Sequence, residues 1–314
     1  MRRYIIKRLI LVLPTLFIVF SLIFLIIRLI PGDVVEMMVF EQGFADDTEE
    51  IRAMLGLDQP LYKQYYKYIK GIFSLDLGTS LWSGEPVINE LSRRLPVSFQ
   101  LACMAIFWAF VTGILFGVIS ALKQDKPLDY IVRTIGIGGL SIPDFWLAIL
   151  IVVFGAILFK WVPPTNYIPF TRNPLGNISQ FIVPSLVLSL YMSASIMRMT
   201  RTMMLEVMRE DYIRTAIAKG LSVRVMIIRH ALKNALIPVV SIMGLQLAFL
   251  IGGTIIMEQI FVLPGMGKYL LNAITWRDYP VIQGINLFIS TLIITINLIV
   301  DLIYGLLDPR IRYQ

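Results

Sequence analysis

The amino-acid sequence predicts an all-α polytopic integral membrane protein with six transmembrane helices. Hydrophobic residues make up 57% of the 314 residues, charged residues only 16%, and the mean hydropathy is +0.76, values that soluble globular domains do not reach. Several apolar runs are long enough to cross a bilayer. Basic residues cluster at the ends of these runs, so the formal charge of +7 indicates membrane topology, and no nucleic-acid partner is expected.

A basic start, MRRYIIKR, precedes the first apolar run, which extends from Leu9 to Ile27. This run is longer than the roughly 7–15 apolar residues of a secretory signal, and no small-residue cleavage site follows it. We therefore expect residues 1–30 to form a cytoplasmic tail and an uncleaved first transmembrane helix. Arg28, near the far end of this helix, can extend its guanidinium to the membrane surface.

Residues 31–96 are polar and rich in acids, which predicts an external insert and not a span. A first short helix is predicted to begin at Asp47 or Thr48 and to stop at Gly56. A second short helix is predicted over Pro60–Phe73. The insert is too small to bury a large core of its own, so we expect it to pack on the membrane domain or on a partner subunit.

Residues 97–314 are predicted to hold the other five spans. These are expected at Val97–Leu122, about Tyr130–Phe159, Phe181–Met199, Leu236–Met257 and Val281–Leu307, with a short re-entrant or interfacial helix at Lys268–Trp276. Gly113 and Gly117 have the small-xxx-small spacing that permits close helix contact. With six spans, both termini are expected in the cytoplasm.

The third predicted span is irregular near mid-membrane, where Gly138, Gly139 and Pro143 disturb the helix. Irregular backbone at that depth is tolerated only where protein or water satisfies the freed polar groups. An intramembrane carboxylate is by default a functional candidate, so we interpret Asp144 and the nearby Ser141 as translocation-path residues. An alternative interpretation is that Asp144 caps a helix or lies near an interface.

Residues 201–235, between the fourth and fifth spans, are strongly basic and are named the basic loop. The excess of Arg and Lys places this loop in the cytoplasm and indicates a docking surface. Ala216 and Gly220 are small residues one helical turn apart, where another surface can approach closely. Gly220 can also end a helix in a left-handed cap, and Ser222 can cap a second helix.

Motifs for catalysis and cofactor binding are missing from the sequence. It contains no G-x-x-x-x-G-K-[ST] phosphate loop and no H-E-x-x-H, and its single cysteine and single histidine cannot form a metal cage by themselves. We therefore expect no cofactor and no metal on this chain. Two remote alternatives remain: a channel built from symmetric copies, and an intramembrane hydrolase in which His230 would have to activate Ser141.

The basic loop resembles the signature loop of the membrane subunits of binding-protein-dependent ABC importers, which reads E-A-A, three residues, G, nine residues, I-x-L-P. The matching positions are occupied by Arg214, Thr215, Ala216, Gly220 and Leu232. Arg214 and Thr215 replace the first two motif residues, and His230 and Lys233 replace the Ile and the Pro. These departures are similar to the dipeptide/oligopeptide/nickel branch, whose wording is A-x-A-K-G-L and R-H-A-L-x-N-A-L-I-P.

Other stretches extend this resemblance over nearly the whole chain. DLGTS ends at Ser80, an E-x-x-F-x-x-P-G-x-G stretch starts at Glu258, and R-D-Y-P starts at Arg277. The resemblance implies the first permease subunit of a type I ABC importer, with an external insert after helix 1. Such a subunit is not an enzyme, because ATP hydrolysis belongs to its partners.

The resemblance also implies partners, coupling residues and cargo. The partners would be a second homologous permease subunit, two cytoplasmic ATPase subunits, an external substrate-binding protein and the lipid bilayer. The implied ATPase-coupling residues are Arg214, Thr215, Ala216, Lys219, Gly220, Leu221, Arg224 and Leu232. Di- or oligopeptides are the favoured cargo, with nickel chelates, glutathione and oligosaccharides as alternatives.

Overall fold

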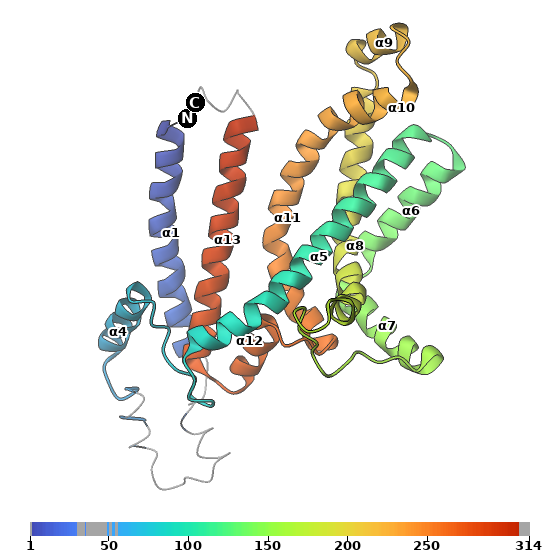
Figure 1. Ribbon diagram of the computed structural model, residues 1–314. Coiled ribbons are helices and arrows are strands. Elements are labelled where there is room, and N and C mark those ends of the chain that lie inside the picture. Colours follow the sequence, from blue (N-terminus) through green and yellow to red (C-terminus); the bar gives the residue numbers. More distant parts are fainter. Residues whose placement is uncertain (1, 30–34, 36–48, 50–51, 54–55, 308–314) are drawn as a thin grey trace. The chain divides into compact units, whose positions relative to one another are not determined.

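The computed structural model describes residues 2–29, 35, 49, 52–53 and 56–307, without the side chains of residues 2–9, 237, 241, 244–245, 247–249, 251–253 and 300–307. Over these ranges the chain forms helices and no named strand (Figure 1), so the predicted all-α fold is confirmed. The helix predicted from Asp47 or Thr48 to Gly56 lies mostly outside the described residues. The chain divides into two compact units, one containing residues up to 96 and 264–298, the other mainly residues 97–263.

The helices are distributed between the two units as follows. The first unit contains most of α1 (Arg2–Leu29), α4 (Leu61–Phe73), α12 (Met266–Thr275) and α13 (Tyr279–Leu307); the second contains most of α5 (Val87–Leu122), α6 (Pro127–Ser141), α7 (Asp144–Phe159), α8 (Pro174–Val207), α9 (Asp211–Ala218), α10 (Val223–Val225), the π-helix η1 (Met226–Leu232) and α11 (Lys233–Ile260).

Among the described residues, four helices are long and apolar enough to cross a membrane: α1, α5, α8 and α13. The predicted third span is two helices, α6 and α7, which meet at a bend of 97°. The cause is local, because Pro143 cannot continue a helix and holds the preceding Ile142 extended, at φ −94° and ψ 121°. α11 covers the predicted fifth span, and part of its side chains are described.

α5 and α8 are among the helices that begin earlier than the apolar runs predict. α5 begins at Val87 and not at Val97, and α8 begins at Pro174 and not at Phe181. In α8, Asn173 caps the helix by accepting a hydrogen bond of 3.0 Å from the Gly176 N–H, and proline suits the first helical position. Hydropathy therefore identifies only the apolar part of each helix.

The second unit is organised around α8, which contacts α6, α7 and α11 (Figure 1). α5 also approaches α8 closely at the two glycines that predict such a contact. A Cβ atom added to Gly117 would lie 2.6 Å from the Cβ of Thr200, and one added to Gly113 would meet a side chain of α8 at the same distance. Next to them, the hydroxyls of Thr112 and Ser193 are 2.7 Å apart. The predicted small-residue contact is confirmed.

In the first unit, α4 confirms the second predicted helix of the insert and packs on the end of α1. The ring of Tyr65 lies edge-on to Phe24 at 5.3 Å between centroids, and its hydroxyl is 2.6 Å from the Ser21 hydroxyl. The Tyr68 ring lies 5.6 Å from the same phenylalanine. The insert is thus attached to the first transmembrane helix by one tyrosine-rich face.

Candidate functional site

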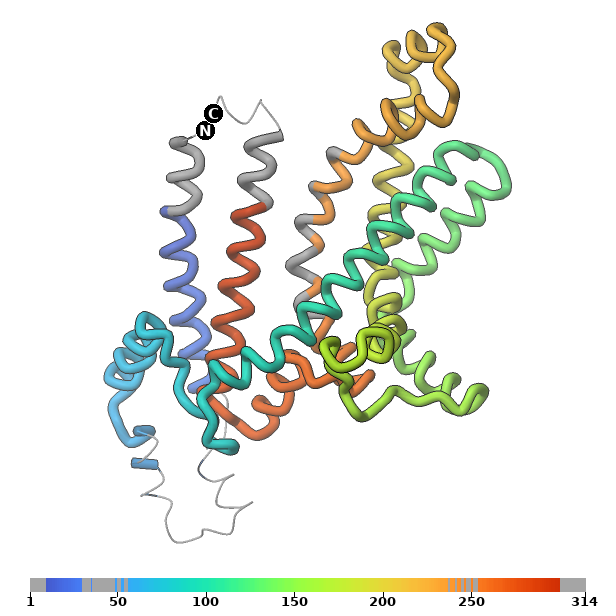
Figure 2. Tube along the Cα trace, viewed as in Figure 1, coloured from blue at the N-terminus to red at the C-terminus, as the bar shows by residue number. Residues whose placement is uncertain are grey.

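The basic loop consists of the end of α8, the short helix α9, and a return through α10 and η1 into α11 (Figure 2). Asp211 begins α9, and its carboxylate is stabilised there by the positive end of the helix dipole. Gly220 follows its end with φ +78°, and its N–H bonds to the Ile217 carbonyl at 2.9 Å. The predicted left-handed end of this helix is therefore confirmed.

One face of α9 is buried against the neighbouring helices. Ile213 is 1% exposed and packs in a cluster with Met204 of α8 and Met226 of η1. The amide of Asn234 in α11 donates a hydrogen bond of 2.8 Å to the Tyr212 hydroxyl. Burying a side chain of the size of Ile213 stabilises by about 1.5–3 kcal/mol. α9 is therefore anchored to the rest of the second unit.

The other side of the basic loop is exposed and carries most of the predicted coupling residues. Those exposed are Arg214, Thr215, Lys219, Gly220, Leu221 and Arg224. Ala216 is buried beneath them, and Leu232 is partly buried in the cluster that holds α9. Within the described part of the chain, Lys219 and Arg224 form no ion pair, whereas Arg214 lies 3.4 Å from an exposed Asp211 carboxylate.

Large apolar side chains in the same stretch of the chain are also exposed. Ile217 is 54% exposed, Val223 66% and Ile228 56%. Exposed large apolar side chains interspersed with charged residues are typical of a surface that another protein covers. The conformation of the basic loop therefore suits the docking role that its sequence predicts.

The segment of the basic loop that leads back to α11 contains a π-helical turn that the sequence does not predict. This turn, η1, includes Arg229 and His230. Such turns are rare and often occur at functional sites. Ser222 precedes α10 as predicted, but its side chain forms no capping hydrogen bond.

The two predicted path residues lie on either side of the bend between α6 and α7. Ser141 is the last residue of α6, and its hydroxyl donates to the Ile137 carbonyl at 2.9 Å. Asp144 is the first residue of α7, is only partly buried, and accepts a hydrogen bond of 2.8 Å from the Phe145 N–H. A hydroxyl bonded to its own helix does not support the hydrolase alternative, in which His230 would be its partner.

A buried ion pair that sequence reasoning missed joins the start of α6 to α8. Asp129 is fully buried, and both its oxygens accept from Arg201, at 3.0 Å from Nε and 2.8 Å from a terminal nitrogen. The Ser120 hydroxyl and the Asp125 N–H also donate to this carboxylate. In the sequence, Arg201 is one of many basic residues in the basic loop. Its charge alone therefore does not indicate that it has a buried partner.

Another buried carboxylate lies at the end of α11. Glu258, the first residue of the E-x-x-F-x-x-P-G-x-G stretch, is fully buried and accepts a hydrogen bond of 2.5 Å from the Ser98 hydroxyl of α5. An isolated buried carboxylate would be costly, so this contact helps to place the end of α11 on α5. The sequence motif marks the position of the glutamate, and the structure shows that Ser98 donates a hydrogen bond to it.

A third buried carboxylate belongs to the first unit. Asp278 is 3% exposed and is the aspartate of the R-D-Y-P stretch. The Ser80 hydroxyl, from DLGTS, donates to it at 2.6 Å. Burial raises the pKa of Asp278 above its usual range, and the hydrogen bonds from Ser80 and from backbone N–H groups counteract part of this rise.

Comparison with known proteins relates this architecture to transport. The profile of the binding-protein-dependent transport system inner membrane component matches residues 113–313, and the profile of the N-terminal part of such components matches residues 1–102. The di/tripeptide transport system permease protein DppB of Pseudomonas aeruginosa (strain UCBPP-PA14) is 40% identical, over all of both chains. The glutathione transport system permease protein GsiC of Escherichia coli (strain K12) is 38% identical, and a candidate peptide transport system permease of Brucella abortus (strain 2308) is 41% identical, each likewise over all of both chains.

Two solved structures share the fold. The MetNI methionine ABC transporter in an inward-facing conformation has a chain that superposes with a TM-score of 0.56 at 18% identity, covering 70% of this chain and 97% of that one. An amino acid ABC transporter solved with histidines gives a TM-score of 0.51 at 15% identity, covering 76% and 98%. At these identities the likeness shows a common membrane-subunit fold.

Proposed function

Because the chain belongs to the family of binding-protein-dependent transport system inner membrane components, we propose that it forms half of the translocation path of an ATP-driven importer of di- or oligopeptides. It is a multi-pass membrane subunit and not an enzyme. The observation that carries the proposal is an identity of 38% to 41%, over the whole chain, to relatives named for peptide or glutathione transport.

Members of this family work with ATPase and binding-protein components. For this chain, we propose a complex with one second, homologous permease subunit, two ATPase subunits on the cytoplasmic side and one external substrate-binding protein. The positive-inside bias supports this orientation, with the basic loop and both termini in the cytoplasm. No cofactor is required on the chain itself.

The exposed surface of the basic loop is the proposed ATPase contact. Its unpaired cations and exposed apolar side chains supply charge and buried area to a partner. Ile213 of α9 packs in one cluster with Met204 of α8 and Ala235 of α11, so a displacement of α9 is transmitted to two long helices together. ATP binding can then favour one of two permease conformations through the difference in contacts at this surface.

The bend between α6 and α7 is the proposed path region. It places a hydroxyl, that of Ser141, and a carboxylate, that of Asp144, at the break between the apolar ends of two helices. Polar groups within a membrane subunit are retained where they line a water-filled cavity. Amide groups of a peptide could bond to both side chains.

Cargo can be tested with the complete importer in proteoliposomes. We expect ATP-dependent uptake of radiolabelled di- or tripeptides when the cognate binding protein is present. Glutathione is the second candidate, because a 38% identical relative is named for it. Uptake of a nickel chelate or an oligosaccharide, with none of either peptide cargo, would contradict the proposal.

A further inference from the structure

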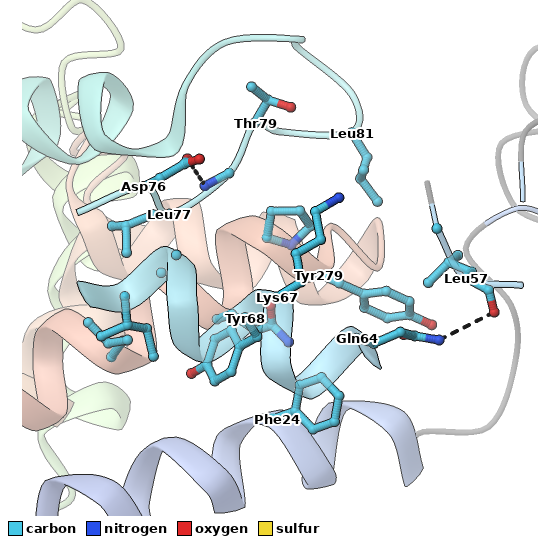
Figure 3. Close-up of a pocket in the computed structure, with 18 of the residues that line it drawn as sticks. Phe24, Leu57, Gln64, Lys67, Tyr68, Asp76, Leu77, Thr79, Leu81 and Tyr279 are labelled. Carbon is cyan, nitrogen blue, oxygen red and sulfur yellow. Dashed lines mark hydrogen bonds between the residues drawn. The ribbon is translucent and has the colours of Figure 1, made fainter. Parts of the chain in front are cut away.

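A cavity of about 310 Å³ lies in the first unit between the end of α1, α4 and the start of α13 (Figure 3). Its lining includes Phe24 and Arg28 of α1, Gln64 of α4, and Gln283 of α13. Its volume is within the range of small-ligand sites, about 300–1,000 Å³. The transport function proposed above does not use this cavity.

Four residues that line the cavity have a buried polar atom without a hydrogen-bond partner in the described part of the chain. These atoms are Arg28 Nε, Gln64 Oε1, the Tyr68 hydroxyl oxygen and Gln283 Nε2. Leaving one buried polar group unpaired costs about 1–3 kcal/mol, so such groups are seldom found together. Because they come from three helices, a single polar ligand in the cavity would satisfy them jointly.

The charge of the lining indicates an anion. The Arg28 guanidinium lies over the rings of Phe24 and Tyr279, at 5.2 Å and 5.3 Å from their centroids. Aromatic contact with the faces of a guanidinium leaves its in-plane N–H groups able to donate. Lys67 adds a second positive charge. The lining also contains one carboxylate, that of Asp76, which accepts a hydrogen bond of 2.9 Å from the backbone N–H of Gly78, so positive charge predominates.

We propose that this cavity binds the phosphate of a phospholipid headgroup. Arg28 is in the last turn of α1 and close to the end of the apolar stretch Ile10–Leu29, where the hydrocarbon core gives way to headgroups. Arg28 and Gln283 supply N–H donors for phosphate oxygens. Gln64 Oε1 is an acceptor and suits a hydroxyl or ammonium group attached to that phosphate.

The surface next to the cavity favours a lipid over a free anion. Leu25 and Leu29, one turn apart on α1, form a row beside Arg28 and are 51% and 80% exposed, so they provide an apolar track for acyl chains. A free phosphate would use the same donors but would leave this track uncovered. The lipid therefore accounts for both the polar and the apolar observations.

The test measures the unfolding temperature of the complete importer in detergent while one of three compounds is added. The compounds are phosphatidylglycerol, diacylglycerol with the same acyl chains, and inorganic phosphate. We expect stabilisation by phosphatidylglycerol alone. Arg28→Gln and Gln283→Leu should each raise its half-saturating concentration by about tenfold, as loss of one hydrogen bond to a charged group predicts.

Lys70→Gln is the matched control, because it removes an exposed cation of α4 that does not line the cavity. This variant should respond to phosphatidylglycerol as the parent does. Gln283→Leu keeps the cation and so tests the site even if the Arg28 variant does not assemble. Equal stabilisation by inorganic phosphate or by diacylglycerol, or an undiminished response in Gln283→Leu, would overturn the proposal.

Discussion

Ser80 donates a hydrogen bond of 2.6 Å to the carboxylate of Asp278, although the two residues are 198 positions apart. The contact joins the end of the insert to the turn before α13. The indole N–H of Trp82 reinforces it by donating to the Trp276 carbonyl at 2.8 Å. The Ser80 and Asp278 side chains are both buried. This pair therefore fixes the insert to the turn before α13, at a point separate from the α1–α4 contact.

The first prediction concerns the pH dependence of this contact. The pKa of Asp278 is higher in the folded chain than in the unfolded one, so the folded state binds more protons and its stability falls as pH rises through the weakly acidic range. The stabilisation is fully present below the usual aspartate pKa of about 3.9. Asp278→Asn should remove this dependence, measured as the unfolding temperature of the purified importer against pH.

Ser80→Ala removes a hydrogen bond that favours the ionised carboxylate, so the same loss of stability should extend to higher pH. At neutral pH this variant should be destabilised by about 1.5–3 kcal/mol. Ser83→Ala, which changes an exposed hydroxyl in the same turn, is the control and should follow the parent curve. An unchanged pH profile in both Ser80→Ala and Asp278→Asn would contradict this account of the pair.

The second prediction concerns the buried ion pair of Asp129 and Arg201. Arg201→Met leaves an uncompensated buried carboxylate, which should cost about 3–5 kcal/mol. The double variant Asp129→Leu/Arg201→Met should be more stable than Arg201→Met alone, because no buried charge remains. Unfolding temperatures of the purified importer measure both effects.

An exposed ion pair gives the control for that experiment. Arg93 lies 3.0 Å from Glu85, with side chains 63% and 42% exposed. Glu85→Gln should cost less than about 1 kcal/mol, because solvent screens such pairs. If Arg201→Met were as mild as Glu85→Gln, the buried pair would not hold α6 on α8.

The third prediction concerns the bend between α6 and α7. If Asp144 lines the path, Asp144→Asn should lower ATP-driven uptake, or uncouple it from ATP hydrolysis, while the complex still assembles. Asp125→Asn, at an exposed acid in a turn, should leave both unchanged. Normal uptake and assembly with Asn, Ala and Leu at position 144 would exclude an essential role for this carboxylate, and reduced assembly alone would indicate a helix-start role.

The fourth prediction concerns topology. In a Cys103→Ala background, cysteines placed at Ser83 and Arg172 should react with a membrane-impermeant thiol reagent added outside the cell, whereas a cysteine at Ser222 should not. All three positions are exposed. Position 172 is chosen because the adjacent Asn173 caps α8. Labelling of Ser222→Cys alone would invert the proposed orientation.

Much of the fold is predictable because an apolar run long enough to span a bilayer has few other stable conformations. α1 and α13 contain their predicted spans, and the spacing of Gly113 and Gly117 predicts a close helix contact, for which the structure supplies the partner, α8. Helix starts are less predictable, because a cap such as Asn173 can begin a helix outside the apolar run.

The buried polar pairs could not be predicted in the same way. Hydropathy gives no signal for which of many cations meets Asp129, since Arg201 is 72 positions away. The π-helical register of η1 differs from an α-helix by a shift in hydrogen-bond partners, and no local pattern indicates it. In the basic loop, by contrast, charge and the left-handed preference of Gly220 are local properties, so its form was predictable.

The most direct test of the central claim, that the basic loop is the ATPase contact, uses two glycines with matched geometry. Gly220 and Gly84 have φ values of +78° and +69°, and neither has an atom within 4 Å of the position that a Cβ would occupy. Leucine at either position should therefore cost a similar backbone strain, about 1–2 kcal/mol, without a clash inside the chain.

The measurement is the amount of ATPase that copurifies with each membrane-inserted variant. Gly220→Leu should lose most of the ATPase, because its side chain would enter the proposed docking surface, whereas Gly84→Leu should retain it. Full copurification of the ATPase with Gly220→Leu would contradict the claim, as would an equal loss in both variants.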